Sequence, residues 1–318
     1  MIVRSVDVAR RAGVSRATVS QILNGHADRF APETTARVLQ AADELDYQPS
    51  VAARALRRGS SDIVIALIPN TTFGGNLQDL FERMTEDLSK RGFTLLLRMT
   101  NPDPSALDRL VVSLKPAAVM SMTPFTPEER ELLTQREILF TDPPSSSQID
   151  HNHAIGQLQA STLIERGHRR LAFAHLSDAR QDPFGFAREE GVRAAAREAG
   201  LEDIKVVRLA VRLDSALTAL DELAPPRVGV ACYNDEVAAA LLAAARVRGF
   251  GVPEDVALIG MDASPLSRVT LPALTTVEYD MGAAARTASV ALLHTLSASG
   301  PEAAANPAAL RLVAGGTV

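Results

Sequence analysis

The sequence predicts a multidomain protein with a small all-α head at its N-terminus and a larger, bilobed α/β body that contains two doubly wound parallel sheets. Three observations support this fold class. Residues 5–24 read as two short helices joined by a tight turn. From Asp62 onward, apolar runs typical of buried strands alternate with helical segments. The alternation occurs twice in succession, over about 100 residues each time, which predicts two lobes with a cleft between them.

The first helix of the head is predicted from Val6, Ala9 and Ala12, which recur at helical spacing. Gly13 follows at a position where a left-handed helix end suits glycine. Ser15 is expected to cap the second helix, because its hydroxyl can accept a free backbone N–H. The second helix is expected to bury its apolar residues and to expose its polar or small ones. The buried set is Val19, Ile22 and Leu23, and the exposed set is Arg16, Ala17, Ser20, Gln21 and Asn24.

Two helices at this spacing form a helix-turn-helix, which inserts its second helix into the major groove of DNA. An ordinary helical hairpin with a solvated polar face is the alternative. The charge distribution favours DNA. The whole chain has a net charge of −5, but residues 1–60 carry nine Arg, no Lys and six acidic residues, a balance of +3. The remaining residues carry 24 basic and 32 acidic side chains, a balance of −8, as expected when only the head contacts phosphates.

A third helix is expected to complete the head. Pro32 suits its first position, and Ala31 stands where a capping side chain would be more favourable. Its apolar face is expected to cover the other two helices with Val38, Leu39, Ala42 and Leu45. Ser50 then caps a short, basic, alanine-rich segment that is too short to be a stable helix by itself, and residues 59–61 form a flexible exit.

The body is expected to contain strands separated by helices. The predicted strands are residues 63–69, 92–97, 117–122, 138–141, 171–175, 206–209, 228–232, 256–260 and 310–313. The predicted helices include residues 77–91, 155–166, 188–199 and 235–248. The Ala/Pro-rich stretch 299–307 is expected to be a linker before the last strand.

Composition excludes several classes of protein. Apolar residues make up 46% of the chain, and no apolar run approaches the roughly 18 residues of a membrane-spanning helix. The N-terminus has no apolar signal core, which argues against an exported, solute-binding transport protein. Cys232, the only cysteine, lies in an apolar run and is expected to be a buried, unreactive thiol. We therefore expect a cytoplasmic protein.

The chain resembles LacI-type transcriptional repressors over nearly its whole length. In the head, the matching motifs are residues 8–20 (VARRAGVSRATVS), 22–25 (ILNG), 32–34 (PET), 41–45 (AADEL), 47–49 (YQP) and 52–56 (AARAL). In the body, they are residues 163–171 (LIERGHRRL), 188–191 (REEG), 234–235 (ND), 251–256 (GVPEDV), 260–262 (GMD) and 272–277 (PALTTV).

The resemblance implies a ligand-responsive repressor that binds a pseudo-palindromic operator in double-stranded DNA as a homodimer. It implies a DNA-binding domain at residues 1–47, a hinge helix and linker at 48–61, and an effector-binding and dimerisation domain at 62–318. The latter would resemble type I periplasmic binding proteins. Its first lobe is expected to comprise about residues 62–152 and 280–299, and its second lobe about residues 153–279 and 303–318. No cofactor is expected.

The resemblance also implies roles for individual residues of the DNA-binding region. Arg16 and Ala17 occupy positions that read base edges, where Arg can grip guanine and Ala can touch a thymine methyl. Gln21 replaces a common Arg and can pair with adenine. The phosphate-contacting residues would be Thr18, Ser20 and Asn24. In the hinge, the contacts would come from Ser50, Ala53 and Leu56, with Leu56 acting as a wedge in the minor groove.

In the body, the resemblance implies an effector site at the carboxyl ends of strands. Its residues would be Asp142, Arg188, Asn234 and Asp262, joined by Phe73 and Asn76 in an unusual first-lobe loop. Two carboxylates, a guanidinium and an amide suit a sugar-like ligand, because carboxylates accept from hydroxyls and arginine donates to oxygens. A surface ion pair or a helix cap is the alternative role for each of these residues. A nucleoside or purine effector is an alternative to a sugar.

The residues leave two other possibilities, an enzyme and a metal site. An enzyme acting on a small sugar-like substrate is disfavoured, because the chain lacks a Walker loop, a G-x-S-x-G elbow and an H-E-x-x-H motif. His151 and His153 form a His-x-His pair that could bind a metal, but we expect them to lie in a loop that enters a helix, and no metal site is expected.

Overall fold

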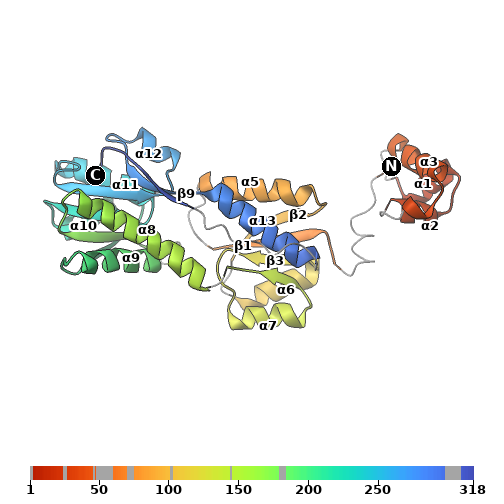
Figure 1. Ribbon diagram of the computed structural model, residues 1–318, viewed down its shortest axis with the longest axis horizontal. Helices are drawn as coiled ribbons and strands as arrows, with labels where there is room; N and C mark the ends of the chain where they lie inside the picture. The colour runs from red at the N-terminus through yellow and green to blue at the C-terminus, as the bar shows by residue number, and fades with distance from the viewer. Residues whose placement is uncertain are drawn as a thin grey trace. The chain divides into compact units, whose positions relative to one another are not determined.

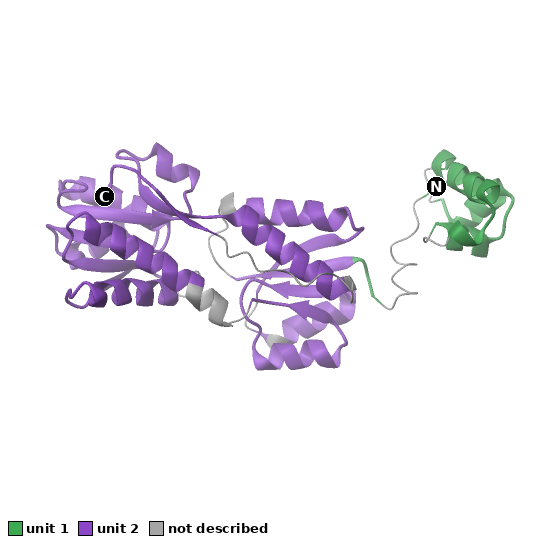
Figure 2. Cartoon of the chain, in the orientation of Figure 1, with its two compact units in different colours: residues 1–62 green, residues 63–318 purple. Residues whose placement is uncertain are grey.

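The computed structural model describes residues 3–23, 27–45, 47, 60–69, 75–100, 103–143, 145–178, 184–297 and 309–318. The chain divides into two compact units, a head of residues 1–62 and a body of residues 63–318 (Figure 2). The head is helical and the body contains two largely parallel sheets, which confirms the predicted fold class.

The described residues of the head form three α-helices around an apolar core. The helices are α1 (Ser5–Ala12), α2 (Arg16–Ile22) and α3 (Pro32–Glu44), with a 3-10 turn at Ala27–Arg29. Gly13 adopts the left-handed conformation that ends α1 (φ +66°), and the Ser15 hydroxyl accepts the Thr18 N–H at 3.0 Å to cap α2. Ala31 precedes α3 without a side-chain cap. The buried core consists of Val8, Ala9, Ala12, Val19, Ile22, Val38, Ala41 and Ala42.

Two residues that were predicted to lie in the core of the head are exposed, so these two predictions were wrong. Val6 is 45% exposed, and Leu39 is 51% exposed. In α1, Val8 is buried with Ala12 because the two residues are four apart and share a face, whereas Val6 lies at the edge of that face. In α3, Ala41 is buried and Leu39 lies at the edge for the same reason. In both helices the position around the helix, and not apolar character alone, decides which residue is buried.

The first sheet of the body has four parallel strands in the order β2-β1-β3-β4. The strands are β1 (Ile63–Ile68), β2 (Thr94–Met99), β3 (Ala118–Ser121) and β4 (Leu139–Thr141). Its helices are α5 (Gly75–Ser89), α6 (Pro104–Leu114), α7 (Pro127–Gln135) and α13 (Met281–Ser297). Alternate residues of β1 point to opposite faces. Val64, Ala66 and Ile68 pack with α5 and α13, whereas Ile65 and Leu67 pack with α6 and α7 (Figure 1).

The second sheet has six strands in the order β10-β9-β8-β7-β5-β6. The strands are β5 (Leu171–Leu176), β6 (Lys205–Leu209), β7 (Val228–Cys232), β8 (Val256–Met261), β9 (Thr275–Tyr279) and β10 (Leu310–Val313). Its helices are α8 (Ser145–Glu165), α9 (Gly185–Glu198), α10 (Leu213–Leu223), α11 (Asp235–Arg248) and α12 (Pro265–Val269). Only β10 runs antiparallel, along β9 at the sheet edge. The predicted linker 299–307 lies outside the described residues.

Helix α8 begins at Ser145, ten residues before the predicted start, because its first turns lack the apolar periodicity that marks a helix in a sequence. It packs against α9 through glycines instead. A Cβ atom on Gly156 would lie 1.9 Å from the Arg188 carbonyl oxygen, and one on Gly191 would lie 2.0 Å from the His153 carbonyl oxygen. The two backbones therefore touch, and this contact fixes the positions of the polar side chains that the two helices carry.

Candidate functional site

The second helix of the head presents the predicted DNA-facing residues at the surface. Arg16, Ala17 and Gln21 are exposed, while Thr18 and Ser20 are half-buried. The opposite side of α2 buries Val19 and Ile22 in the head core. The helix thus exposes Arg16, Ala17 and Gln21 on the side away from the core, and the insertion of this face into a major groove stays a prediction.

Several predicted site residues lie where the structure describes nothing about their side chains. Asn76 belongs to α5, but only its backbone is described. The predicted DNA-contacting residues Asn24, Ser50, Ala53 and Leu56 and the predicted effector residue Phe73 lie outside the described residues.

Arg188, in the first turns of α9, is the best-defined candidate effector residue. It is 6% exposed. Its Nε donates to Asn152 Oδ1 at 3.0 Å, and its Nη1 donates to the Tyr233 carbonyl at 2.6 Å. The guanidinium carbon lies 4.9 Å from the centre of the Tyr233 ring and 5.9 Å from that of Phe184. The described residues thus hold Arg188 in place through two of its five N–H groups, which leaves donors for a ligand oxygen.

Asn234 follows Tyr233 directly and is also buried. Its Oδ1 accepts the Val237 N–H at 3.0 Å, so Asn234 is the N-cap of α11. Because Arg188 binds the carbonyl of the preceding residue, the structure brings these two predicted residues together at the carboxyl end of β7. Asn152, on α8, joins them. It lies within the segment that was predicted to be a loop, so the sequence reasoning passed over it.

Asp262 lies directly after β8, at the same edge of the second sheet, in a backbone conformation that is unusual for a non-glycine residue (φ +104°). Close to it, Asp235 was missed as a site residue although the Asn-Asp pair contributed to the family resemblance. Asp235 is 1% exposed and accepts hydrogen bonds from Thr276 and Ser264. Burial raises the pKa of Asp235, while these hydrogen bonds oppose the shift.

Asp142 directly follows β4 of the first sheet and is held by contacts within its own lobe. Its Oδ2 accepts the Phe125 N–H at 2.7 Å and Arg130 Nη2 at 2.6 Å. The side chain is only 6% exposed, whereas that of Arg130 is 45% exposed. The ion pair considered as the alternative role of Asp142 is therefore present, and it positions the start of α7 relative to β4.

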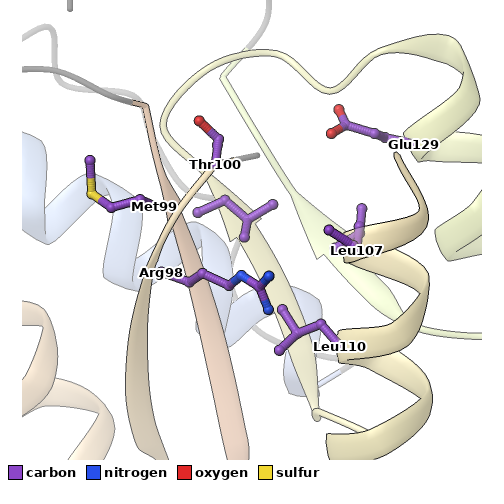
Figure 3. Close-up of a pocket in the computed structure, with 8 residues that line it drawn as sticks. Arg98, Met99, Thr100, Leu107, Leu110 and Glu129 are labelled. Carbon is purple, nitrogen blue, oxygen red and sulfur yellow. The ribbon is translucent and has the colours of Figure 1, made fainter. Parts of the chain in front are cut away.

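A small pocket of about 20 Å³ lies in the first lobe, between the carboxyl ends of β1 and β2 and the helices α6 and α7. Its lining includes the polar residues Arg98 and Glu129 and the apolar residues Leu107 and Leu110 (Figure 3). A pocket of this volume holds about one water molecule, so it is too small for a sugar or a purine.

The remaining chemistry-bearing residues have structural roles. His151 and His153 lie inside α8, not in a loop, so the predicted loop was wrong. Two residues apart on a helix, they point to different sides and do not form a chelating pair. Among the described residues, no group of three or more His, Cys, Asp or Glu could hold a metal. Cys232 is buried as predicted, and burial raises the pKa of its thiol, which keeps it protonated.

Two family models match the chain, one in the head and one in the body. Residues 6–50 match the family model described as "Bacterial regulatory proteins, lacI family", and residues 160–318 match "Periplasmic binding protein-like domain". The ribose operon repressor of Halalkalibacterium halodurans is 32% identical over 295 residues, which cover 87% of this chain and 86% of the relative. The chain belongs to the LacI family of transcriptional regulators.

Other relatives extend this assignment. The repressor PurR of Vibrio atlanticus is 31% identical over 293 residues, 85% of each chain. Among solved structures, the lac repressor dimer bound to operator superposes with a TM-score of 0.78 at 17% identity, over 100% of this chain and 99% of that one. The transcriptional regulator CelR in complex with cellobiose superposes with a TM-score of 0.66 at 24% identity, over 99% and 100%. The LacI-family chain is thus a DNA-binding regulator and not an enzyme. Within the described residues, no helix is long and apolar enough to cross a membrane.

Proposed function

We propose that this LacI-family chain is a cytoplasmic repressor that binds a pseudo-palindromic operator as a homodimer and responds to a small, sugar-like effector. The observation that carries the proposal is the exposed face of α2, formed by Arg16, Ala17 and Gln21, on a head that is joined to a two-sheet body. A basic head that exposes this face meets phosphates and base edges. The hinge helix around Ser50, Ala53 and Leu56, with Leu56 as the minor-groove wedge, belongs to the same proposal.

The effector part of the proposal rests on the polar cluster at the carboxyl ends of β7 and β8. Three of its side chains are buried, those of Arg188, Asn152 and Asn234. Two of the five N–H groups of Arg188 bind described residues, which leaves donors for a ligand. Together with Asp262 these side chains suit hydroxyl groups, which both donate and accept. Asp142, Phe73 and Asn76 would complete the site from the first lobe, in the cleft expected between the lobes.

The effector class has two candidates. A sugar is supported by the hydroxyl-binding residue set and by relatives whose names include ribose and cellobiose. A purine is supported by the similarity to repressors named PurR. D-ribose, cellobiose and the purine bases adenine, guanine and hypoxanthine are therefore the probes that we choose. By the population-shift argument, the effector acts by favouring one arrangement of the lobes, and only one arrangement lets paired hinge helices form on DNA.

Removal of residues 1–60 tests this modular function. The truncated body should lose operator binding, measured as a band shift on DNA selected with the full-length protein. It should still bind whichever probe the full-length chain binds, with an unchanged dissociation constant by calorimetry. A truncated but folded body that loses both activities would contradict the proposal, because the two sites would then not be separable. Circular dichroism of the truncated body serves as the control for folding.

A further inference from the structure

The turn that carries Asp262 is held in an unfavourable backbone conformation. Asp262 has φ +104° and Ala263 has φ +48°, and neither is glycine. Such conformations are unfavourable for non-glycine residues and persist only where surrounding groups hold them. The described contacts of residues 262–264 therefore identify what maintains this turn.

Each backbone N–H of the turn has a defined acceptor. The Asp262 N–H donates to the Val277 carbonyl at 2.9 Å, and the Ala263 N–H donates to Thr276 Oγ1 at 3.3 Å. The Ser264 N–H donates to Asp235 Oδ2 at 2.7 Å. Two acceptors are on β9, and the third is a side chain of α11. Asp235 thus links the turn to a different element.

The Asp235 carboxylate is the centre of these contacts. Its Oδ1 accepts from Thr276 Oγ1 at 2.6 Å, and its Oδ2 accepts from Ser264 Oγ at 2.9 Å as well as from the Ser264 N–H. Asp235 is the first residue of α11 and follows Asn234, so the same short segment carries a candidate effector residue and the anchor of the turn. A buried carboxylate with several donors is a rigid connection, because hydrogen bonds to a charged acceptor are short and are strengthened by the low dielectric of the interior.

The strands leave space for this carboxylate. A Cβ atom on Gly260 would lie 2.1 Å from Asp235 Oδ1, so Gly260 is needed for Asp235 to occupy its position. The pairing of β7 with β8 ends at Ala231 and Ile259. The carbonyl of the next residue in each strand accepts a hydrogen bond from one and the same side chain of α8. Gln159 Nε2 donates to the Cys232 carbonyl at 3.0 Å and to the Gly260 carbonyl at 2.9 Å. The ends of β7 and β8 are therefore fixed by side chains where their own ladder stops.

We propose that Asp235 is a positioning residue for the effector site, because its carboxylate fixes the turn 262–264 relative to the start of α11. It thereby sets the separation of Asp262 from Asn234 and Arg188. This inference rests on the proposed effector site, and it assigns Asp235 no contact with the effector. Whether Asp235 holds the turn can be tested on the protein without any ligand.

The Asp235→Asn variant tests the proposal, because it keeps the side chain's size but presents an N–H₂ group to hydrogen-bond donors. Thr317→Val is the matched control. Thr317 is fully buried in the same sheet, where its Oγ1 donates to the Leu258 carbonyl at 2.6 Å and accepts the Thr275 N–H at 2.9 Å. Both variants lose buried hydrogen bonds, but only the first loses those of the turn.

Calorimetry with whichever of D-ribose, cellobiose and the purine bases the wild type binds gives the first readout. Asp235→Asn should weaken binding about tenfold or more, whereas Thr317→Val should lower the melting temperature and leave the dissociation constant unchanged. If both variants lose thermal stability and both retain wild-type affinity, Asp235 has only a structural role and the proposal is overturned.

Amide hydrogen exchange of residues 262–264 gives the second readout, on the full-length protein without ligand. Asp235→Asn should raise the exchange rate of these amides about tenfold, while Thr317→Val should not change it. Unchanged exchange in Asp235→Asn would contradict the proposal. If the wild type binds no probe, the effector class of the proposed function fails, and the exchange result still decides whether Asp235 holds the turn.

Discussion

The head and the second sheet of the body hold their functional side chains in opposite ways. On α2, Arg16 and Gln21 are exposed, and the helix is positioned by a small core and a Ser15 cap. At the ends of β7 and β8, Arg188 and Asn234 are buried and hydrogen-bonded to other elements. On the proposed DNA-reading face, one side chain can change at a time, whereas the proposed effector site is built into the core and cannot change in this way. The loss of binding that a substitution causes should therefore differ between the two regions.

The largest effect is expected at Arg188. Arg188→Ala should weaken binding of the probe that the wild type recognises by at least about 100-fold, because the ligand and the partners of Arg188 all lose a charged donor. Operator affinity without effector should stay unchanged. Calorimetry and band shifts measure the two quantities.

Arg193→Ala is the matched control for this substitution. Arg193 lies on the same helix and forms ion pairs with Glu189 and Asp203, away from the Asn152–Tyr233 cluster. It should retain probe binding. Equal losses in Arg188→Ala and Arg193→Ala would show that the helix as a whole was perturbed and would remove Arg188 from the site.

A smaller effect is expected on the exposed face of the head. Arg16→Ala should weaken operator binding by about 1–3 kcal/mol and relax the preference at one base pair, because Arg16 is proposed to donate to a guanine. Probe binding should be unaffected. Competition assays with single-base operator variants measure the change, and a uniform loss at every base pair would reassign Arg16 to the phosphate backbone.

The smallest effect is expected at the start of α3, where Ala31 provides no side-chain cap. Ala31→Ser should stabilise the head by about 1 kcal/mol and slow amide exchange in α3 about fivefold. Ser15→Ala should change exchange in α2 in the opposite direction, because the Ser15 cap is present. Unchanged amide exchange in Ala31→Ser would contradict this prediction, because it would mean that fraying at the start of α3 does not limit opening of the head.

The sequence predicted the elements whose signals are local. Gly13, Ser15 and Pro32 mark helix ends through their own backbone preferences, and each was placed correctly. Continuous apolar runs likewise marked β1, β7 and β8, which are buried on both faces, whereas β9 (Thr275–Tyr279) has no such run and was not predicted. The start of α8 was missed, since its early turns are stabilised by backbone contact with α9 and not by an apolar stripe.

The candidate site was predicted less completely than the fold. The pairing of Arg188 with the end of β7 agrees with the expected placement, but Asn152 and Asp235 act through partners that are far away in the sequence. A sequence motif shows that such residues occur together, not which atoms they contact. The ion pair of Asp142 with Arg130 is a further contact that only the folded chain reveals.

The backbone contact between α8 and α9 has a practical consequence for converting this regulator into a biosensor. Gly156 and Gly191 leave no room for a methyl group, so mutant libraries that aim at a new effector should keep both glycines constant. Diversity can then be introduced at Asn152 and its neighbours. Variants recovered from such a library would differ in what they recognise while sharing one scaffold geometry.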